Sequence, residues 1–392
     1  MPLPTIDIVY ERQWSSLNNL IAAVTKMGLM GRLYGGFPKF RYERAGIPKE
    51  ILRTFPISAL WNYFAFKCKL PKAANLTEPK IVGNWVARHR DLAPFVIANG
   101  TAHRFLFPKL KGTGRTLILE RGSMHPEDLF HFAQRARREA GYSYTDQLPL
   151  SQIDEIEKNK LADYLIAGSE MIRQSYVSRG FPAERVFTCR YGVDPKRFAF
   201  IQRTPAIDRP IKIAAIGLIG FRKGLHRLLK LGEWANQRKI PLEIHFAGPI
   251  YDLEANEMLA KSTAKTNLYG VIKGNEFQKF LAECDLCAVL SYEEGLPLAL
   301  LESMSTGLPP IISTDTGARE VPEDGQEGIH LTVFTDEEFD QKLAPILRAP
   351  EKIIQMGERA RAKIESQFTS EHYSSHIQAA LETIIQLAKY DS

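Results

Sequence analysis

The stretch LCAVLSYEEGLPLALLESMSTGLP, residues 286–309, contains the change of pattern that decides the fold class. Its first six residues form a short apolar run, which is typical of a buried strand. A polar turn with Glu293, Glu294 and Gly295 follows, and apolar residues recur at helical spacing from about Leu298. A strand that passes through a short turn into a helix is typical of proteins with parallel sheets.

The same alternation extends over most of the chain. Strands are predicted at 6–10, 94–100, 116–120, 163–169, 185–192, 211–217, 242–248, 286–291 and 308–314. Helical patterns include 16–28, 125–141, 169–180 and 370–389. Because strands and helices alternate, we expect an α/β protein with doubly wound parallel sheets. The stretch FAFIQRTPAIDRP (198–210) lacks periodicity and indicates a linker between two domains, 1–200 and 205–370.

Composition narrows the class of protein. The chain has 392 residues, of which 44% are hydrophobic and 24% are charged, as in globular proteins with two or three domains. No apolar run approaches the ~18–20 residues that cross a bilayer, and no signal-peptide pattern is present. Four cysteines are too few for a disulfide framework, so a cytoplasmic location is expected.

Charge is unevenly distributed along the chain. Residues 1–200 carry 30 Lys and Arg against 18 Asp and Glu, whereas the remainder carries 21 against 27. Basic residues alternate with aromatic ones in RLYGGFPKFRYERAG (32–46) and FPISALWNYFAFKCKLPK (55–72). This pattern predicts peripheral contact of residues 32–72 with an anionic membrane on its inner face. An aromatic core helix with a basic exit is the alternative, and nucleic acid is not expected because no nucleic-acid module is present.

The turn before Leu298 suits a diphosphate, because a helix start offers unpaired amides and partial positive charge. Glu294 lies just before this helix and Glu302 lies about one turn into it. A bound diphosphate would therefore have a carboxylate near each end, each able to accept hydroxyl hydrogen bonds. Two solvated glutamates beside a helix cap are the structural alternative.

A second turn carries positive charge, in AAIGLIGFRKGLHRLL (214–229). It contains Gly220 and the basic pair Arg222-Lys223, a charge that suits a departing diphosphate. An exposed basic loop is the alternative interpretation. Gly217 and Gly220 lack the GxGxxG spacing, so the turn is not a dinucleotide fingerprint.

The segment from Glu294 to Pro309 closely resembles EGxxLxxLEAMAxGxP, the signature of the retaining glycosyltransferases of family four. Residues 214–229 resemble the family pattern VGRLxxxKGxxxLL, with Lys223 on the family lysine and Leu218 where the family has arginine. Similar patterns extend the resemblance over about residues 160–390. It implies the GT-B architecture, in which two Rossmann-like domains face a central cleft.

The resemblance also implies roles for residues in the C-terminal, donor-binding domain. Glu294 is expected to contact the transferred sugar and Glu302 the ribose. Lys223 is expected to bind the diphosphate, helped by Arg222. The donor site would further include Gly220, Gly295 and the amides of Leu298 and Ala299. A final helix within 371–392 is expected to cross back to the N-terminal, acceptor-binding domain.

On the acceptor side, many family members place a histidine close to the sugar. Here TLILERGSMHPEDLF (116–130) offers His125 as a third catalytic candidate, with a helix-capping role as the alternative. Arg121, Ser169 and Tyr191 are further candidates for the acceptor side of the cleft.

Metals and cofactors are not expected. Cys284 and Cys287 have the spacing of half a metal site, but Cys68 and Cys189 are distant in sequence, so packing is predicted. No Asp-x-Asp motif is present to hold a divalent metal on a diphosphate. The nucleotide-sugar is a substrate.

The sequence therefore predicts a retaining, metal-independent hexosyltransferase. It would move a sugar from a nucleotide-sugar donor to a glycan or lipid-linked acceptor in polysaccharide, lipopolysaccharide or glycolipid synthesis. An epimerase or sugar phosphorylase on the same fold is one alternative, and a non-catalytic carbohydrate- or membrane-binding relative is another. The pattern does not name the sugar, the base or the acceptor.

Overall fold

The computed structural model describes residues 4–10, 15–57, 59 and 71–390. The chain divides into two compact units. The N-terminal unit comprises Met1–Glu127, Leu148–Arg190 and Glu371–Ser392, and the C-terminal unit comprises Asp128–Gln147 and Tyr191–Ser370. Each unit contains one parallel sheet flanked by helices, so the predicted α/β class is confirmed.

In the N-terminal unit, the described strands form one sheet in the order β3-β2-β1-β4-β5-β6-β7, and every pairing is parallel. The strands are β1 (Ile6–Tyr10), β2 (Met30–Gly35), β3 (Leu52–Thr54), β4 (Phe95–Ala98), β5 (Thr116–Arg121), β6 (Tyr164–Ala167) and β7 (Val186–Thr188). Strands β1, β4 and β6 are buried at every residue, as expected where helices cover both faces of a sheet.

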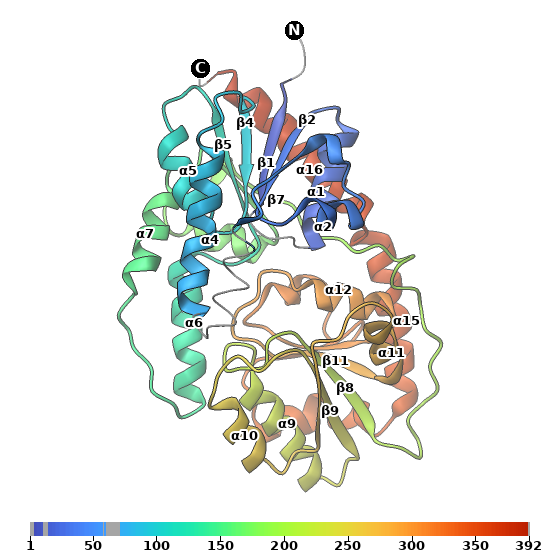
Figure 1. Ribbon diagram of the computed structural model, residues 1–392. Helices are drawn as coiled ribbons and strands as arrows, with labels where there is room; N and C mark the ends of the chain where they lie inside the picture. Colours follow the sequence, from blue (N-terminus) through green and yellow to red (C-terminus); the bar gives the residue numbers. More distant parts are fainter. Residues whose placement is uncertain (1–3, 11–14, 58, 60–70, 391–392) are drawn as a thin grey trace. The chain divides into compact units, whose positions relative to one another are not determined.

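Helices connect and cover these strands (Figure 1). Those described in this unit are α1 (Ser15–Lys26), α2 (Lys39–Arg44), α4 (Pro71–Val86), α5 (His103–Leu110), α7 (Leu150–Asn159), α8 (Glu170–Val177) and α16 (Ser370–Ala388), with 3₁₀ turns η1 (Lys49–Ile51) and η2 (Ala183–Arg185). The predicted helices 16–28, 169–180 and 370–389 are thus confirmed to within a few residues.

In the C-terminal unit, the strand order is β10-β9-β8-β11-β12-β13, again with parallel pairings. The strands are β8 (Ile211–Ile216), β9 (Leu242–Ala247), β10 (Thr266–Gly270), β11 (Leu286–Val289), β12 (Pro310–Ser313) and β13 (Ile329–Leu331). The order reverses between β8 and β11. Open α/β sheets bind ligands beyond the carboxyl ends of the strands at such a switch point.

Figure 1 shows α9 and α10 on one side of this sheet and α11, α12 and α15 on the other. The helices described here are α9 (Leu225–Gln237), α10 (Ala255–Lys261), α11 (Asn275–Glu283), α12 (Leu298–Ser305), α13 (Asp336–Lys342), α14 (Ala344–Leu347) and α15 (Pro350–Gln367), with the 3₁₀ turn η3 (Gly317–Glu320). Residues 199–210 contain neither helix nor strand, as predicted for the linker.

Helix α6 (Pro126–Glu139) begins in the N-terminal unit and continues into the C-terminal unit. Its later part packs there, where Ala136 is buried in a cluster with Phe221 and Tyr292. The division predicted from sequence, 1–200 and 205–370, did not include this exchange of residues 128–147. Local periodicity shows that a helix has a buried face but not which distant residues cover it.

Candidate functional site

The two predicted donor loops meet at the switch point of the C-terminal sheet. Strand β8 leads into residues 217–224, the β8 turn, which precede α9. Strand β11 leads into residues 290–297, the signature loop, which precede α12. The amide of Tyr292 donates to the carbonyl of Arg222 at 2.9 Å, which joins the two loops directly.

Two glycines allow the β8 turn to pass close to its neighbours. Gly224 has a φ of +77°, and a Cβ there would lie 2.1 Å from the carbonyl oxygen of Leu290. A Cβ on Gly220 would lie 2.3 Å from Oδ2 of Asp252, which accepts a hydrogen bond from the Phe221 amide at 2.7 Å. Residues with a side chain could not follow this path without strain.

Three ion pairs link the turn to the signature loop. The Lys223 ammonium donates to the Glu294 carboxylate. The Arg222 guanidinium donates to the carbonyl and the carboxylate of Glu293, each at 2.8 Å, and lies 3.6 Å from Glu294. Glu293 is 1% exposed, so this pair satisfies a buried charge. The sequence did not indicate a role for Glu293, because its partner lies 71 positions away.

A cavity opens between these loops and the start of α12. It is lined by residues of the β8 turn and of the signature segment, including Gly217, Leu218, Gly220, Lys223, Ser291, Pro297, Ala299 and Ser303. Pro297 precedes the first residue of α12, and the first amides of a helix have no partners within the helix. The cavity therefore offers an ammonium group and helix-start amides to an anion.

Glu302 lies on α12 and is half-buried. Burial raises the pKa of its carboxyl to about 7, against an opposing effect of Arg197. Ser303, the next residue, lines the cavity, whereas Glu302 is not among the lining residues. Its predicted contact with a ribose stays a prediction.

A third loop, after β12, also reaches the signature loop. The amide of Gly317, the first residue of η3, donates to the carbonyl of Glu294 at 2.9 Å. Glu294 is thus held through its carboxylate by Lys223 and through its backbone by Gly317.

In the N-terminal unit, the candidates Arg121 and His125 are both buried. Arg121 ends β5 and is 6% exposed, and its guanidinium pairs with Glu155 at 3.0 Å. The amide of His125 donates to the Ser175 hydroxyl at 2.9 Å, while its Nδ1 accepts from the Glu127 amide at 3.3 Å. This second bond fits the helix-capping alternative for His125. Its predicted contact with the sugar stays a prediction.

The remaining candidates have structural contacts as well. The Ser169 hydroxyl is buried and accepts from the Ile172 amide at 3.3 Å, which caps α8. Tyr191 is 7% exposed and belongs to the C-terminal unit. Cys284 and Cys287 are buried free thiols whose pKa values burial raises to about 12, which agrees with the packing prediction.

The described residues contain neither a metal-binding cluster nor a membrane-spanning helix. Within residues 4–10, 15–57, 59 and 71–390, no cluster of His, Cys, Asp and Glu side chains is placed to hold a metal ion. In the same part of the chain, no helix has the length and apolar character needed to span a membrane.

Part of the chain resembles a known protein family in sequence. Residues 197–363 match the family model described as "Glycosyl transferases group 1". The match includes the β8 turn, the signature loop and α12, which form the cavity.

Relatives of known sequence match in part. The amylovoran biosynthesis glycosyltransferase AmsK of Erwinia amylovora is 27% identical over 220 residues, 53% of this chain and 53% of AmsK. The lipopolysaccharide 1,6-galactosyltransferase of Salmonella typhimurium is 25% identical over 219 residues, 53% of this chain and 60% of that protein. The chain thus spans about half the length of the curated relatives it matches.

Solved structures share the fold over nearly the whole chain. Anabaena HepE in complex with UDP and glucose is 17% identical with a TM-score of 0.68, covering 97% of this chain and 100% of HepE. Sucrose-phosphate synthase from Thermosynechococcus elongatus is 14% identical with a TM-score of 0.70, covering 98% of this chain and 100% of the synthase. The predicted GT-B fold of two Rossmann-like domains is confirmed.

Proposed function

We propose that the chain transfers a sugar from a nucleotide-sugar donor to a glycan or lipid-linked acceptor in polysaccharide synthesis. The Lys223–Glu294 pair, at the switch point of the sheet in the part of the chain that matches the group 1 glycosyltransferase model, is the observation that carries this proposal. The names of AmsK and of the Salmonella galactosyltransferase support an acceptor of this class.

The pair can change partners when a donor binds. Without a donor, Lys223 and Glu294 neutralise each other. A diphosphate in the cavity competes for the Lys223 ammonium and so frees the Glu294 carboxylate to accept a hydrogen bond from a sugar hydroxyl. Binding of the donor thereby makes the Glu294 carboxylate available to orient the sugar of that donor.

The same residues stabilise the leaving group. The bond between the sugar C1 and the diphosphate oxygen breaks, the acceptor oxygen bonds to C1, and the acceptor proton passes to the leaving phosphate. Lys223, Arg222 and the amides at the start of α12 offset the charge on the departing diphosphate, which is the main electrostatic task of such a reaction. Attack from the same face retains the anomeric configuration, and this charge set needs no metal ion.

Arg222 is suited to replace the family arginine that is missing at Leu218. It lies 3.6 Å from Glu294 while Glu293 holds its guanidinium. Its buried partner Glu293 holds the guanidinium next to Glu294, although Arg222 itself does not line the cavity.

The first experiment identifies the donor and then tests the pair. Thermal-shift screening against UDP-, GDP-, ADP- and TDP-sugars finds the donor, since a ligand stabilises the folded state that binds it. We expect Lys223→Ala and Glu294→Ala each to abolish transfer while the proteins stay folded. Lys230→Ala, at an exposed position of α9, is the matched control. Turnover close to wild type in both variants would refute the assignment.

Product analysis separates the alternative activities. A product formed from donor alone indicates an epimerase, and one that requires added inorganic phosphate indicates a phosphorylase. Donor binding without turnover across a panel of acceptors indicates a binding protein.

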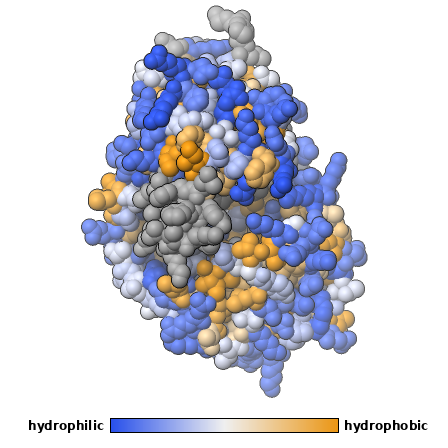
Figure 2. Space-filling view, viewed as in Figure 1, coloured by the Kyte–Doolittle hydropathy of each residue, from blue (hydrophilic) through white to orange (hydrophobic). Residues whose placement is uncertain are grey.

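Peripheral contact with an anionic membrane is a separate proposal. In the described part of segment 32–72, Phe40 is 51% exposed beside the Arg44 guanidinium, 5.3 Å from its ring, and Ile57 is 55% exposed. Residues 58 and 60–70 lie outside the described chain. Figure 2 shows hydrophobic patches within a mostly hydrophilic face. Flotation with anionic and neutral liposomes tests it, and absence of binding at low salt removes it.

A further inference from the structure

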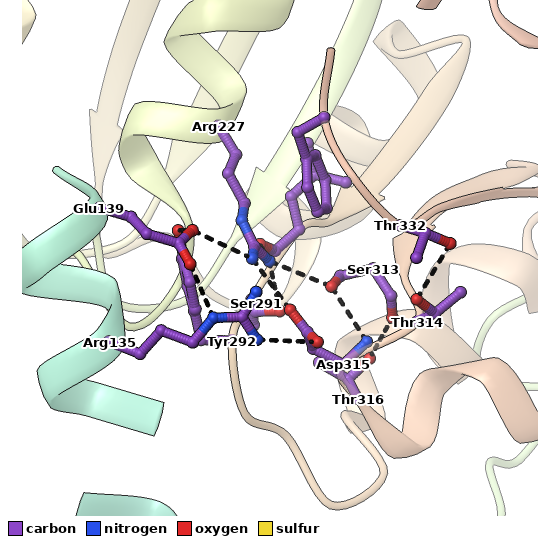
Figure 3. A network of polar contacts seen from close by, with 12 residues as sticks. Arg135, Glu139, Arg227, Ser291, Tyr292, Ser313, Thr314, Asp315, Thr316 and Thr332 are labelled. Carbon is purple, nitrogen blue, oxygen red and sulfur yellow. Dashed lines mark hydrogen bonds and ion pairs between the residues drawn. The ribbon is translucent and has the colours of Figure 1, made fainter. Parts of the chain in front are cut away.

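Helix α9 contains a buried arginine, Arg227, that contacts the signature loop. The Arg227 residue is 3% exposed and does not line the donor cavity. Its Nη1 donates to the carbonyls of Leu290 and Ser291 at 3.2 and 3.3 Å and to the Ser313 hydroxyl at 3.1 Å, and its Nη2 donates to Asp315 at 2.9 Å. One guanidinium thus bonds to the loops that follow β11 and β12 (Figure 3).

The same guanidinium makes cation–π contacts with two aromatic rings. It lies 3.4 Å from the centroid of the Tyr292 ring and 4.0 Å from that of Phe334. Its Nε is buried without a hydrogen-bond partner among the described residues. A buried and incompletely satisfied charge is a costly way to stabilise a fold, and an apolar residue of similar size often does so as well. Stability alone therefore does not account for an arginine here.

Helix α6 completes a closed ring of charges around Tyr292 (Figure 3). Arg135 bonds to Glu139 at 2.7 Å and to Asp315 at 3.2 Å. Arg227 contacts the same two carboxylates, Asp315 at 2.9 Å and Glu139 at 3.7 Å. The Tyr292 hydroxyl donates to Glu139. Each acid is shared by two arginines, so a shift of one member disturbs the others.

This ring acts on Glu294 through both loops. Glu294 lies two residues beyond Tyr292, and its carbonyl accepts from Gly317, which lies two residues beyond Asp315. We propose that Arg227 is a positioning residue that holds the backbone of the signature loop so that Glu294 meets the sugar of the donor. This inference rests on the proposed function.

The test compares Arg227→Met with Arg227→Lys in the full chain. Misplacing a reacting group by about 1 Å can lower a rate by about 100-fold, so we expect a kcat loss of that order for Arg227→Met. The Kd of the nucleoside diphosphate that binds the wild type, chosen from UDP, GDP, ADP and TDP, should stay within about threefold, because Lys223 and the α12 amides are unchanged. Arg227→Lys keeps a positive charge against the Tyr292 side chain, so its kcat should fall less than that of Arg227→Met.

Hydrogen exchange provides a readout that does not depend on activity. In Arg227→Met the amides of Tyr292 and Gly317, which cross between loops, should exchange faster than in the wild type. The control is Arg238→Met, which removes a different arginine–aspartate pair, with Asp340, at the end of α9. If the wild type transfers no sugar, the proposed function fails, and the exchange result still decides the role of Arg227.

A folded Arg227→Met with kcat within twofold of wild type, or with unchanged exchange at both amides, overturns the inference. If Arg227→Met does not fold, Arg227→Lys and Tyr292→Phe decide by the same readouts. In that case, normal kcat and normal exchange in both variants overturn the inference, and a kcat loss with faster loop exchange supports it.

Discussion

Replacing Glu302 by glutamine measures how strongly burial on α12 raises the pKa of the Glu302 carboxyl. Burial raises the pKa of Glu302 from 4.5 to about 7 in the folded chain. Because the folded state then holds the proton more tightly than the unfolded state, the free energy of unfolding falls as pH rises from 4.5 through 7. At about 1.4 kcal/mol per pKa unit, the full loss is about 3 kcal/mol. Glutamine does not titrate and removes this loss.

Urea unfolding of the full chain at pH 5 and pH 8 tests the value. We compare the free energy of unfolding of Glu302→Gln with that of wild type. The difference between them should be about 2.5 kcal/mol larger at pH 8 than at pH 5, since wild type has already lost part of its stability at pH 5. Glu358→Gln, at an exposed position of α15, is the matched control and should show no such difference. A difference below about 0.5 kcal/mol between the two pH values for Glu302→Gln would show that burial does not control this carboxyl.

Gly224→Ala should destabilise the chain by at least about 2 kcal/mol more than Gly325→Ala in urea unfolding. Both positions have positive φ, but only a Cβ on Gly224 meets a carbonyl oxygen, and equal losses would contradict this. If Glu302 accepts ribose hydroxyls, titration calorimetry should show donor affinity rising from pH 6 to pH 8, and Glu302→Gln should abolish the rise. Asp285 is 3% exposed and binds Arg209 at 2.6 Å, so Asp285→Asn should lower the Tm by several degrees and leave the donor KM unchanged; a changed KM with normal Tm would contradict it.

Much of the fold was predictable because burial has a local signature. Strand β1 was predicted at its observed bounds, and β8, β9 and β12 to within two residues at each end, since parallel strands covered on both faces are continuous apolar runs. Strand β10 (Thr266–Gly270) was missed because most of its residues are exposed and form no such run. The short strands β3 (Leu52–Thr54) and β13 (Ile329–Leu331) were missed, since three residues are too few to show a period. The equally short β7 (Val186–Thr188) was predicted only as part of the longer stretch 185–192.

The sequence alone determined which loops carry the candidate chemistry. Lys223 and Glu294 each follow a predicted strand within a recognised motif, and parallel strands in a doubly wound sheet end at the same edge. This local order was enough to expect both residues in one site.

Only the tertiary structure decided how that site is held. The pairing of Arg222 with Glu293 spans 71 positions, and that of Arg135 with Asp315 spans 180. Periodicity predicts whether a residue is buried but not which residue contacts it. A charged residue is predicted to be exposed unless its partner is known. The buried Arg227 and the passage of α6 into the C-terminal unit depend on such distant contacts, so they followed from the folded chain and not from its motifs.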